Sequence, residues 1–74
     1  MMNLIDFLNR LERAKIYYKL NKVNDEFIMV EVAVPGQRWE VEFSDSEIQI
    51  EKFLSDGSIY NESEIEVLFN DFSA

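Results

Sequence analysis

The chain of 74 residues contains no cysteine and no histidine. Without cysteine it can form neither a disulfide framework nor a thiolate metal site, and a reducing compartment suits it. Ser-His-Asp and Cys-His nucleophilic sites are excluded, and so are zinc sites with the usual ligands. The two glycines, Gly36 and Gly57, fall in predicted turns, so no glycine-rich loop can cradle a phosphate. We therefore expect a protein that is not an enzyme and has no cofactor or metal site.

Long apolar runs and a signal peptide are also missing. No stretch approaches the roughly 18 apolar residues of a transmembrane helix. The N-terminus lacks the basic and apolar regions of a secretory signal. These two absences predict a cytoplasmic protein that does not associate with membranes.

Positive charge is scarce, and the net charge is −8. The balance is +3 over residues 1–22 and −11 over residues 23–74. An acidic chain repels the phosphates of nucleic acids, so we expect no nucleic-acid partner. Acidity favours a basic protein partner, although it also promotes solubility without any partner.

A β-hairpin between residues 27 and 43 is the clearest signal in the chain. Its two arms alternate with a period of two, as strands with one buried face do. The segment 35–38 begins with Pro-Gly, a strong turn signal, and is the predicted turn. The predicted cross-strand pairs are Val34–Trp39, Val32–Val41 and Val30–Phe43 on the core face, and Ala33–Glu40 and Glu31–Glu42 on the outward face.

Two more strands complete a four-stranded meander, and a short strand outside that count follows them. Residues 16–23 should pair with the first arm of the hairpin, and residues 48–51 with the second arm. Lys52-Phe53 breaks the alternation, which indicates a bulge or the end of that strand. A turn at 55–58 should precede a short final strand at 59–60. The predicted pairs are Val23–Phe27, Leu20–Val30, Tyr18–Val32, Ile16–Val34, Lys19–Glu31, Phe43–Ile48 and Val41–Ile50.

Residues 4–14 and 62–72 form the two predicted helices. Asn3 is the expected N-cap of the first helix. Asn61 is the expected N-cap of the second, with Glu64 placed for a capping box. The stripes that should face the core are Leu4, Phe7, Leu8 and Leu11, and Ile65, Leu68, Phe69 and Phe72.

The elements together predict one α+β domain over residues 1–74. Its order is a helix, a four-stranded antiparallel meander and a C-terminal helix. Both helices should cover the apolar face of the sheet, because each has an apolar stripe to bury and the sheet offers one apolar face.

The outward face of the predicted sheet combines carboxylates with aromatic and methionine side chains. This mixture is typical of a protein-binding patch. The alternatives are a solvent-facing sheet and the seam of a homodimer. The expected partner-binding residues are Tyr17, Phe27, Met29, Glu31, Glu40, Glu42 and Glu51.

Acidic side chains elsewhere suggest three other interpretations. Paired glutamates such as Glu40 and Glu51 serve in glycosidases, but a chain this short has little room for a substrate cleft. The segments 45–47 and 56–58 carry oxygen ligands without the spacing of a calcium loop, and we interpret them as turns. The second helix offers a rival contact surface made of Glu62, Glu64, Glu66 and Asp71.

The segment from Val32 to Phe43 reads VAVPGQRWEVEF and is followed by Ser55-Asp56-Gly57. Over residues 16–60 the chain resembles a group of short bacterial proteins, mostly uncharacterised, some of which are similar to immunity proteins of secreted toxin systems. The resemblance implies a cytoplasmic bacterial binding protein that caps a basic toxin. The alternative function is a structural or assembly subunit that acts through sheet-edge or sheet-face pairing.

Overall fold

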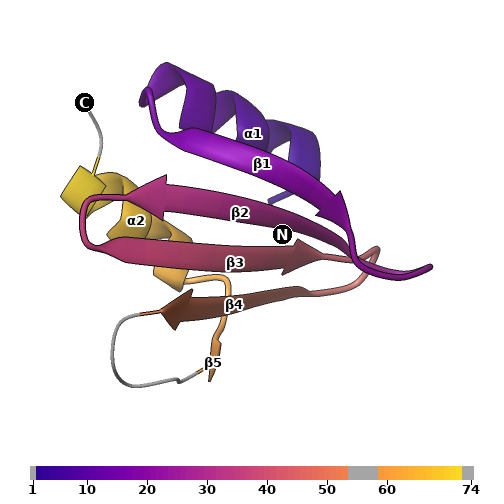
Figure 1. Ribbon diagram of the computed structural model, residues 1–74. Coiled ribbons are helices and arrows are strands. Elements are labelled where there is room, and N and C mark those ends of the chain that lie inside the picture. Colours follow the sequence, from indigo (N-terminus) through magenta and orange to yellow (C-terminus); the bar gives the residue numbers. More distant parts are fainter. Residues whose placement is uncertain (1, 54–58, 73–74) are drawn as a thin grey trace.

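The computed structural model describes residues 2–53 and 59–72. The described chain begins and ends with a helix, and the strands between the two helices form a meander (Figure 1). The elements are α1 (Leu4–Arg13), β1 (Tyr17–Lys22), β2 (Ile28–Val34), β3 (Gln37–Phe43), β4 (Ile48–Phe53), β5 (Ile59–Tyr60) and α2 (Glu64–Phe72). The predicted α+β class, with a helix at each end of an antiparallel sheet, is confirmed. The predicted turn at 55–58 lies outside the described residues.

The sheet has five strands in the order β1-β2-β3-β4-β5, so each strand pairs with its neighbour in sequence. All four pairings are antiparallel. The count of four strands was therefore wrong. The fifth strand is the short final strand predicted at 59–60, which the count of four left out. In it, Tyr60 pairs with Ile50 and Ile59 pairs with Glu51.

Two of the three predicted registers are confirmed. Between β1 and β2, Leu20 lies opposite Val30 and Lys19 lies opposite Glu31. Between β3 and β4, the structure contains both predicted pairs, Phe43–Ile48 and Val41–Ile50.

The register of the central hairpin differs from the prediction by two residues. The turn consists of Pro35 and Gly36 alone, so Val34 lies opposite Gln37 and Val32 lies opposite Trp39. Gly36 adopts a φ of 76°, a conformation that glycine reaches without steric cost. Because side chains alternate with a period of two, this shift changes every cross-strand partner but leaves each side chain on its predicted face.

Helix α1 begins as the sequence indicates. The Asn3 side chain accepts a hydrogen bond of 2.8 Å from the backbone N–H of Asp6, which identifies Asn3 as the N-cap. The helix ends at Arg13, and Lys15 takes a left-handed φ of 60°. The backbone N–H of Ile16 then bonds to the carbonyl of Leu11, which leads the chain directly into β1.

Helix α2 begins at Glu64, two residues later than predicted. The Asn61 side chain accepts a hydrogen bond from the backbone N–H of Ser63, in a turn that precedes the helix. The predicted capping box is wrong, because the Glu64 carboxylate accepts a hydrogen bond of 2.6 Å from Lys52 Nζ. The predicted apolar stripe of α2 does face the core, with Ile65, Leu68 and Phe69 buried.

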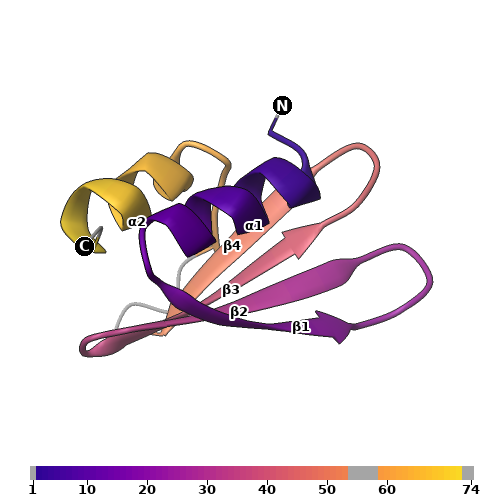
Figure 2. The ribbon, with the colours of Figure 1, turned by 90° about the horizontal axis from the view of Figure 1, so that it is seen from above.

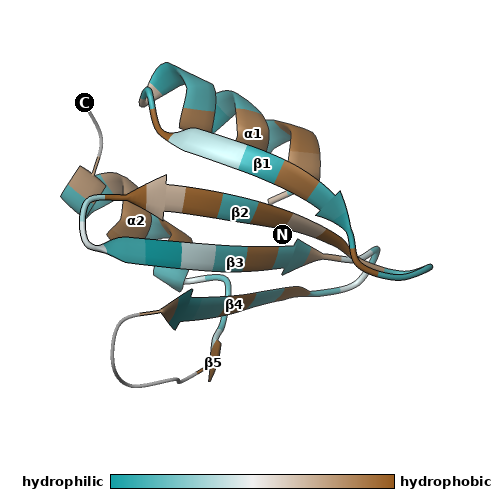
Figure 3. Ribbon diagram, in the orientation of Figure 1, coloured by the Kyte–Doolittle hydropathy of each residue, from teal (hydrophilic) through white to brown (hydrophobic). Residues whose placement is uncertain are grey.

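One core lies between the helices and the sheet. Figure 2 shows α1 and α2 on the same side of the strands. Figure 3 shows hydrophilic and hydrophobic residues alternating along the second half of β3, as a strand with one buried face requires. Strand β2 is hydrophobic except for Glu31. The buried apolar residues are Phe7, Leu8, Leu11, Ala14, Ile16, Val30, Val32, Trp39, Val41, Phe43, Ile48, Ile50, Ile65, Leu68 and Phe69.

Lys52 belongs to this inward face. Strand β4 continues to Phe53 without losing its alternation, and Lys52 lies opposite Trp39. The side chain of Lys52 is buried, and its ammonium pairs with Glu64 of α2. The expected break at residues 52–53 is therefore absent, because a partner on α2 compensates for the lysine inside the sheet.

Candidate functional site

The face of the sheet opposite the helices carries three rows of side chains that run across the strands. The register aligns these rows on neighbouring strands, so members of a row are direct cross-strand neighbours. From the turn between β2 and β3 outward, they are Tyr17–Ala33–Arg38–Phe53, then Lys19–Glu31–Glu40–Glu51–Ile59, then Asn21–Met29–Glu42–Gln49.

The middle row places three carboxylates side by side. Glu40 of β3 lies between Glu31 of β2 and Glu51 of β4. Like charges directly opposite each other on neighbouring strands are destabilising. Two polar contacts offset part of this cost, since Asn21 Nδ2 donates to Glu31 Oε2 and Arg38 Nη2 lies 3.2 Å from Glu40 Oε2.

Glu40 is the electrostatic centre of the row. Its side chain is 18% exposed, against 54% for that of Arg38. Burial raises the pKa of Glu40, and Glu51, Glu31 and Glu42 raise it further, while Arg38 acts in the opposite direction. The folded protein therefore holds an ionised carboxylate where a negative charge is disfavoured, and an additional cation at this position would relieve it.

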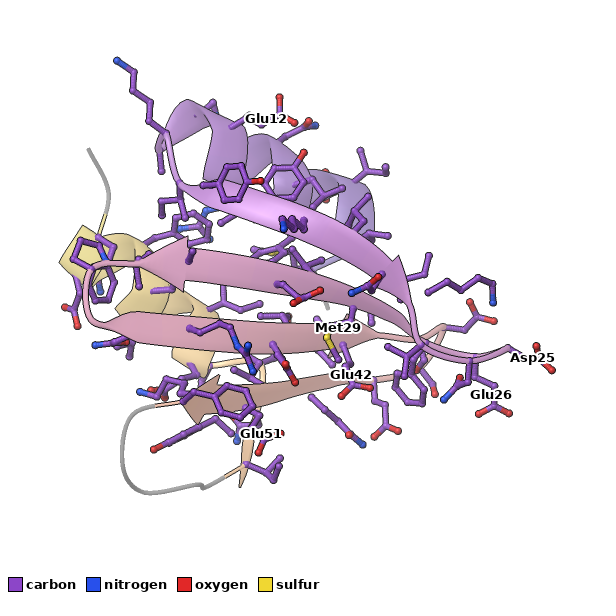
Figure 4. The ribbon with its side chains drawn as sticks, in the orientation of Figure 1. Glu12, Asp25, Glu26, Met29, Glu42 and Glu51 are labelled. Atoms are coloured by element: carbon purple, nitrogen blue, oxygen red, sulfur yellow. The ribbon has the colours of Figure 1, made fainter. Side chains whose placement is uncertain are left out.

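Apolar side chains lie on both sides of the carboxylate row. Tyr17 and Phe53, at the two ends of the first row, are 64% and 42% exposed. The guanidinium of Arg38 lies 4.4 Å from the centre of the Phe53 ring. Met29, in the third row, is half-buried. Figure 4 shows Met29, Glu42 and Glu51 on the side of the sheet opposite the helices.

Phe27 lies apart from the other predicted contact residues. It precedes β2 and lines an open hollow of about 480 Å³ at the end of the sheet. Asp25 and Glu26 of the β1–β2 turn line the same hollow, and Figure 4 shows both at that end of the molecule. Of the seven residues expected to bind a partner, six lie within the three rows and Phe27 lies beyond them.

The shifted register changes two predicted contacts. Glu31 does not lie opposite Glu42, because Glu31 pairs with Glu40 and Glu42 pairs with Met29. The predicted pair Glu40–Glu51 is confirmed.

Sequence reasoning missed Arg38 and Phe53 as members of this face. Continued alternation from Glu40 and from Glu51 would have found them. The assumed four-residue turn concealed Arg38, and the assumed break at residues 52–53 concealed Phe53.

The acidic side of α2 is largely engaged within the molecule. Glu66 pairs with Arg10 through two hydrogen bonds of 2.7 and 3.1 Å, and this contact lowers the pKa of Glu66. Glu64 pairs with Lys52, and Glu62 accepts a hydrogen bond from the backbone N–H of Met2. Asp71 is exposed. These contacts join α2 to α1 and β4, so most of the rival surface has a structural role.

The described residues also bear on metal ligands and on membrane-spanning helices. No group of three or more Asp or Glu side chains within residues 2–53 and 59–72 is arranged to hold a metal ion. Segment 45–47 lies in the β3–β4 turn, whereas the predicted turn at 56–58 is outside the described part of the chain. Neither described helix has the length and apolar character to cross a bilayer.

Comparison with protein-family models, curated proteins and solved structures found no match to this chain. The resemblance to short bacterial proteins therefore stays a prediction.

Proposed function

We propose that this chain is a non-enzymatic protein-binding module and that the outward face of its sheet contacts a basic protein. One observation carries the proposal. Glu31, Glu40 and Glu51 lie side by side on three neighbouring strands, and the pKa of the central carboxylate is raised. An arginine or lysine of a partner placed over Glu40 would pair with the row and offset its internal repulsion.

The accessibility of this face supports the same function. Both helices pack against the other side of the sheet, and no described element covers the outward rows. Tyr17, Met29 and Phe53 border the carboxylates and supply apolar contact area. Aromatic and methionine side chains are enriched in protein interfaces, where they anchor the contact while charges set orientation and association rate.

A basic toxin is the partner class that we propose, with the chain acting as its immunity-type inhibitor in a bacterial cytoplasm. Toxins that cut nucleic acids need a positively charged cleft for their substrate. An acidic face can cover such a cleft without any catalytic group of its own.

The alternative proposal is a structural or assembly subunit that pairs copies of itself. Mass measurement in solution separates the two functions, because an assembly subunit associates without a partner. A stable homodimer that hides the outward face would favour the alternative over a toxin-binding role.

The test compares three forms of the protein in pull-downs from native lysate, with bound proteins identified by mass spectrometry. These are the wild type, a face variant (Glu40→Gln, Glu42→Gln, Glu51→Gln) and a control variant (Asp25→Asn, Glu26→Gln, Glu47→Gln). Both variants lose the same number of negative charges, but the control substitutions lie in turns at the end of the sheet. We expect the face variant to lose a basic partner that the control retains. Equal losses in both variants would mean that net charge, and not this face, determines binding.

Binding kinetics with the captured partner then separate the residues that control the association rate from those that control the dissociation rate. The face variant should associate more slowly and with a weaker salt dependence. Tyr17→Ala and Met29→Ala should mainly accelerate dissociation. Where either residue is a hot spot, the binding free energy should weaken by about 1–2 kcal/mol. Phe27→Ala tests whether the contact extends to the end of the sheet. If neutralising Glu62, Glu66 and Asp71 abolished binding while the face variant bound normally, the contact surface would be α2.

A further inference from the structure

The outer edge of β1 offers backbone groups to another chain. Strand β1 is the first of the sheet, and within the described residues it pairs with β2 alone. The hydrogen bond from Val23 N–H to the Phe27 carbonyl fixes which groups face β2. Because bonding alternates along an antiparallel pair, Tyr17, Lys19 and Asn21 bond to β2. The N–H and C=O groups of Tyr18, Leu20 and Lys22 therefore point away from the sheet.

Apolar side chains follow the same edge. Leu20 is 51% exposed and projects toward the side of the sheet that carries the helices. Figure 1 shows α1 alongside β1 and reaching past its outer edge, and Figure 2 shows α1 on the helix side of the sheet. Glu12 of α1 accepts a hydrogen bond of 2.6 Å from Tyr18 Oη, so this side of α1 faces β1. Ile5 lies two helical turns before Glu12 on the same side of α1 and is 63% exposed.

The charge of this edge is opposite to that of the molecule. Strand β1 reads YYKLNK and carries two lysines and no acidic residue, in a chain with a net charge of −8. Lys19 is on the outward side and lies opposite Glu31, while Lys22 is on the helix side and donates to the carbonyl of Asn24. The acidic side chains next to the strand are Glu12, which bonds to Tyr18 on the helix side, and Glu31 of β2, which bonds to Asn21 on the outward side away from the free edge.

From these three features we propose a second contact site, distinct from the three rows on the outward face. An extended segment of a protein partner adds to β1 as a further strand, beneath the overhang of α1. Its backbone bonds to Tyr18, Leu20 and Lys22, and its apolar side chains pack on Leu20 and Ile5. Its alternate side chains are acidic and reach Lys19 on the outward side. Strand addition of this kind derives affinity from main-chain bonds and specificity from alternate side chains.

A second copy of this chain fits the edge less well than a single strand does. Antiparallel pairing of two β1 strands places a two-fold axis perpendicular to the sheet. Since α1 reaches past the edge, both copies of α1 would then meet over the same seam (Figure 1). The pairing would also bring the basic edges of two copies together, whereas an acidic strand complements them.

The probe is a synthetic peptide, Gly-Val-Glu-Val-Glu-Val-Gly, acetylated and amidated at its ends. Hydrogen exchange of the backbone amides, followed by NMR, reports the added strand directly. At a peptide concentration of about ten times Kd, the amides of Tyr18, Leu20 and Lys22 should exchange about tenfold more slowly. The amides of Tyr17, Lys19 and Asn21 already bond to β2 and should not change. Uniform protection, or no protection at the three outward amides, would overturn the proposal.

Two control peptides test the chemistry of the occupant. A peptide with lysine in place of glutamate should bind at least about tenfold more weakly, because it meets Lys19 with like charge. A peptide with N-methylated backbone amides should not bind, because it cannot complete the strand pairing. Equal binding of the lysine peptide would overturn the acidic assignment.

Substitutions in the protein, instead of in the peptide, test the same site. Lys19→Glu should reverse the preference between the two charged peptides. Leu20→Pro removes an outward N–H and leaves the bonds to β2, so it should abolish peptide binding; proline is tolerated on edge strands for this reason. If Leu20→Pro does not fold, the N-methylated peptide supplies the same information. The free protein could instead have a dimeric mass, with the three outward amides already protected from exchange. That result would identify a second copy as the occupant and overturn the proposal.

Discussion

Trp39 is the largest side chain that is completely buried, at 0% exposure. Its indole Nε1 donates a hydrogen bond of 2.8 Å to Gln37 Oε1, which satisfies the polar group of the ring. On the core face it lies between Val32 of β2 and Lys52 of β4. The ring therefore joins three strands, and the stability of a chain this small depends heavily on it.

Replacing this ring tests its role in the core. Trp39→Ala should lower the free energy of unfolding by about 3–5 kcal/mol, the usual cost of truncating a buried aromatic residue. Such a loss would leave much of the protein unfolded at room temperature. Circular dichroism during thermal unfolding measures the change, since the variant has lost its only tryptophan. Unchanged melting would refute the buried position.

Lys52 is a cation inside the apolar layer. Its Nζ atom lies 2.6 Å from Glu64 Oε2, and the two side chains are 10% and 18% exposed. The ammonium also lies 5.0 Å from the centre of the Trp39 ring and 4.5 Å from that of Tyr60. The pair connects the end of β4 to the first turn of α2.

Removing one member of this pair should cost more than removing both. Lys52→Met leaves the Glu64 carboxylate in a largely buried position, and we expect a loss of about 2–4 kcal/mol. The double variant Lys52→Met, Glu64→Leu should recover most of that loss, because apolar replacements of buried ion pairs are often neutral. Denaturant unfolding followed by Trp39 fluorescence measures both changes. A single variant as stable as the wild type would show that the pair has no structural role.

At the scale of elements, local signals determine where α1 begins. The Asn3 side chain bonds to the N–H of Asp6, and Asp6 places a negative charge in the first turn, next to the positive end of the helix dipole. Asn3→Ala should cost about 1 kcal/mol of stability, whereas Asn3→Ser should cost little because serine caps equally well. Denaturant titrations of both variants supply the comparison. Equal losses of stability in the two variants would mean that Asn3 stabilises the protein mainly through a contact other than the N-cap.

The register between β2 and β3 is also decided at the scale of elements. The alternation of β2 and β3 assigns each side chain to a face but leaves the turn length open by two residues. The tight Pro35-Gly36 turn selects the register that places Arg38 next to Glu40 on the outward face. The composition of the carboxylate row therefore depends on the conformation of two turn residues.

For the whole molecule, two shifted pKa values act in opposite directions on stability. The pKa of Glu40 is raised, so its destabilising charge is relieved as pH falls through its folded pKa, and the relief is complete below its ordinary value of 4.5. The pKa of Glu66 is lowered by Arg10, so its stabilising contribution is present above 4.5 and lost below it. The two effects therefore occupy different pH ranges.

At low salt the melting temperature should accordingly be higher at pH 5.5 than at pH 7. The raised pKa lets Glu40 take up its proton as pH falls toward 4.5, whereas the contribution of Glu66 is retained above 4.5. Glu40→Gln should raise the melting temperature at pH 7 and remove most of this pH dependence. Thermal melts at the two pH values measure both outcomes. A wild type that melts clearly lower at pH 5.5 would mean that groups stabilised as carboxylates dominate.

Local patterns in the sequence were sufficient for the class of the fold, the two helical stripes, the N-cap of α1 and two of the three predicted strand registers. They succeed because helical and strand periodicities, and the pairing of a strand with its neighbour, depend on residues close in sequence. The seven predicted contact residues followed from the same alternation, and six of them do share the outward face.

Only the tertiary structure decided the features that depend on distant partners. Lys52 turns inward because Glu64, twelve residues later, receives its ammonium, and the same contact draws Glu64 away from a capping role. The register of β2 with β3 determines that Glu40, and not Glu42, lies opposite Glu31. The raised pKa of Glu40 follows from its burial and from the carboxylates of the neighbouring strands. The position of α1 past the edge of β1 follows from the packing of the helix on the sheet. A one-dimensional pattern cannot specify these features, because each is a contact between elements whose spacing is set by the core.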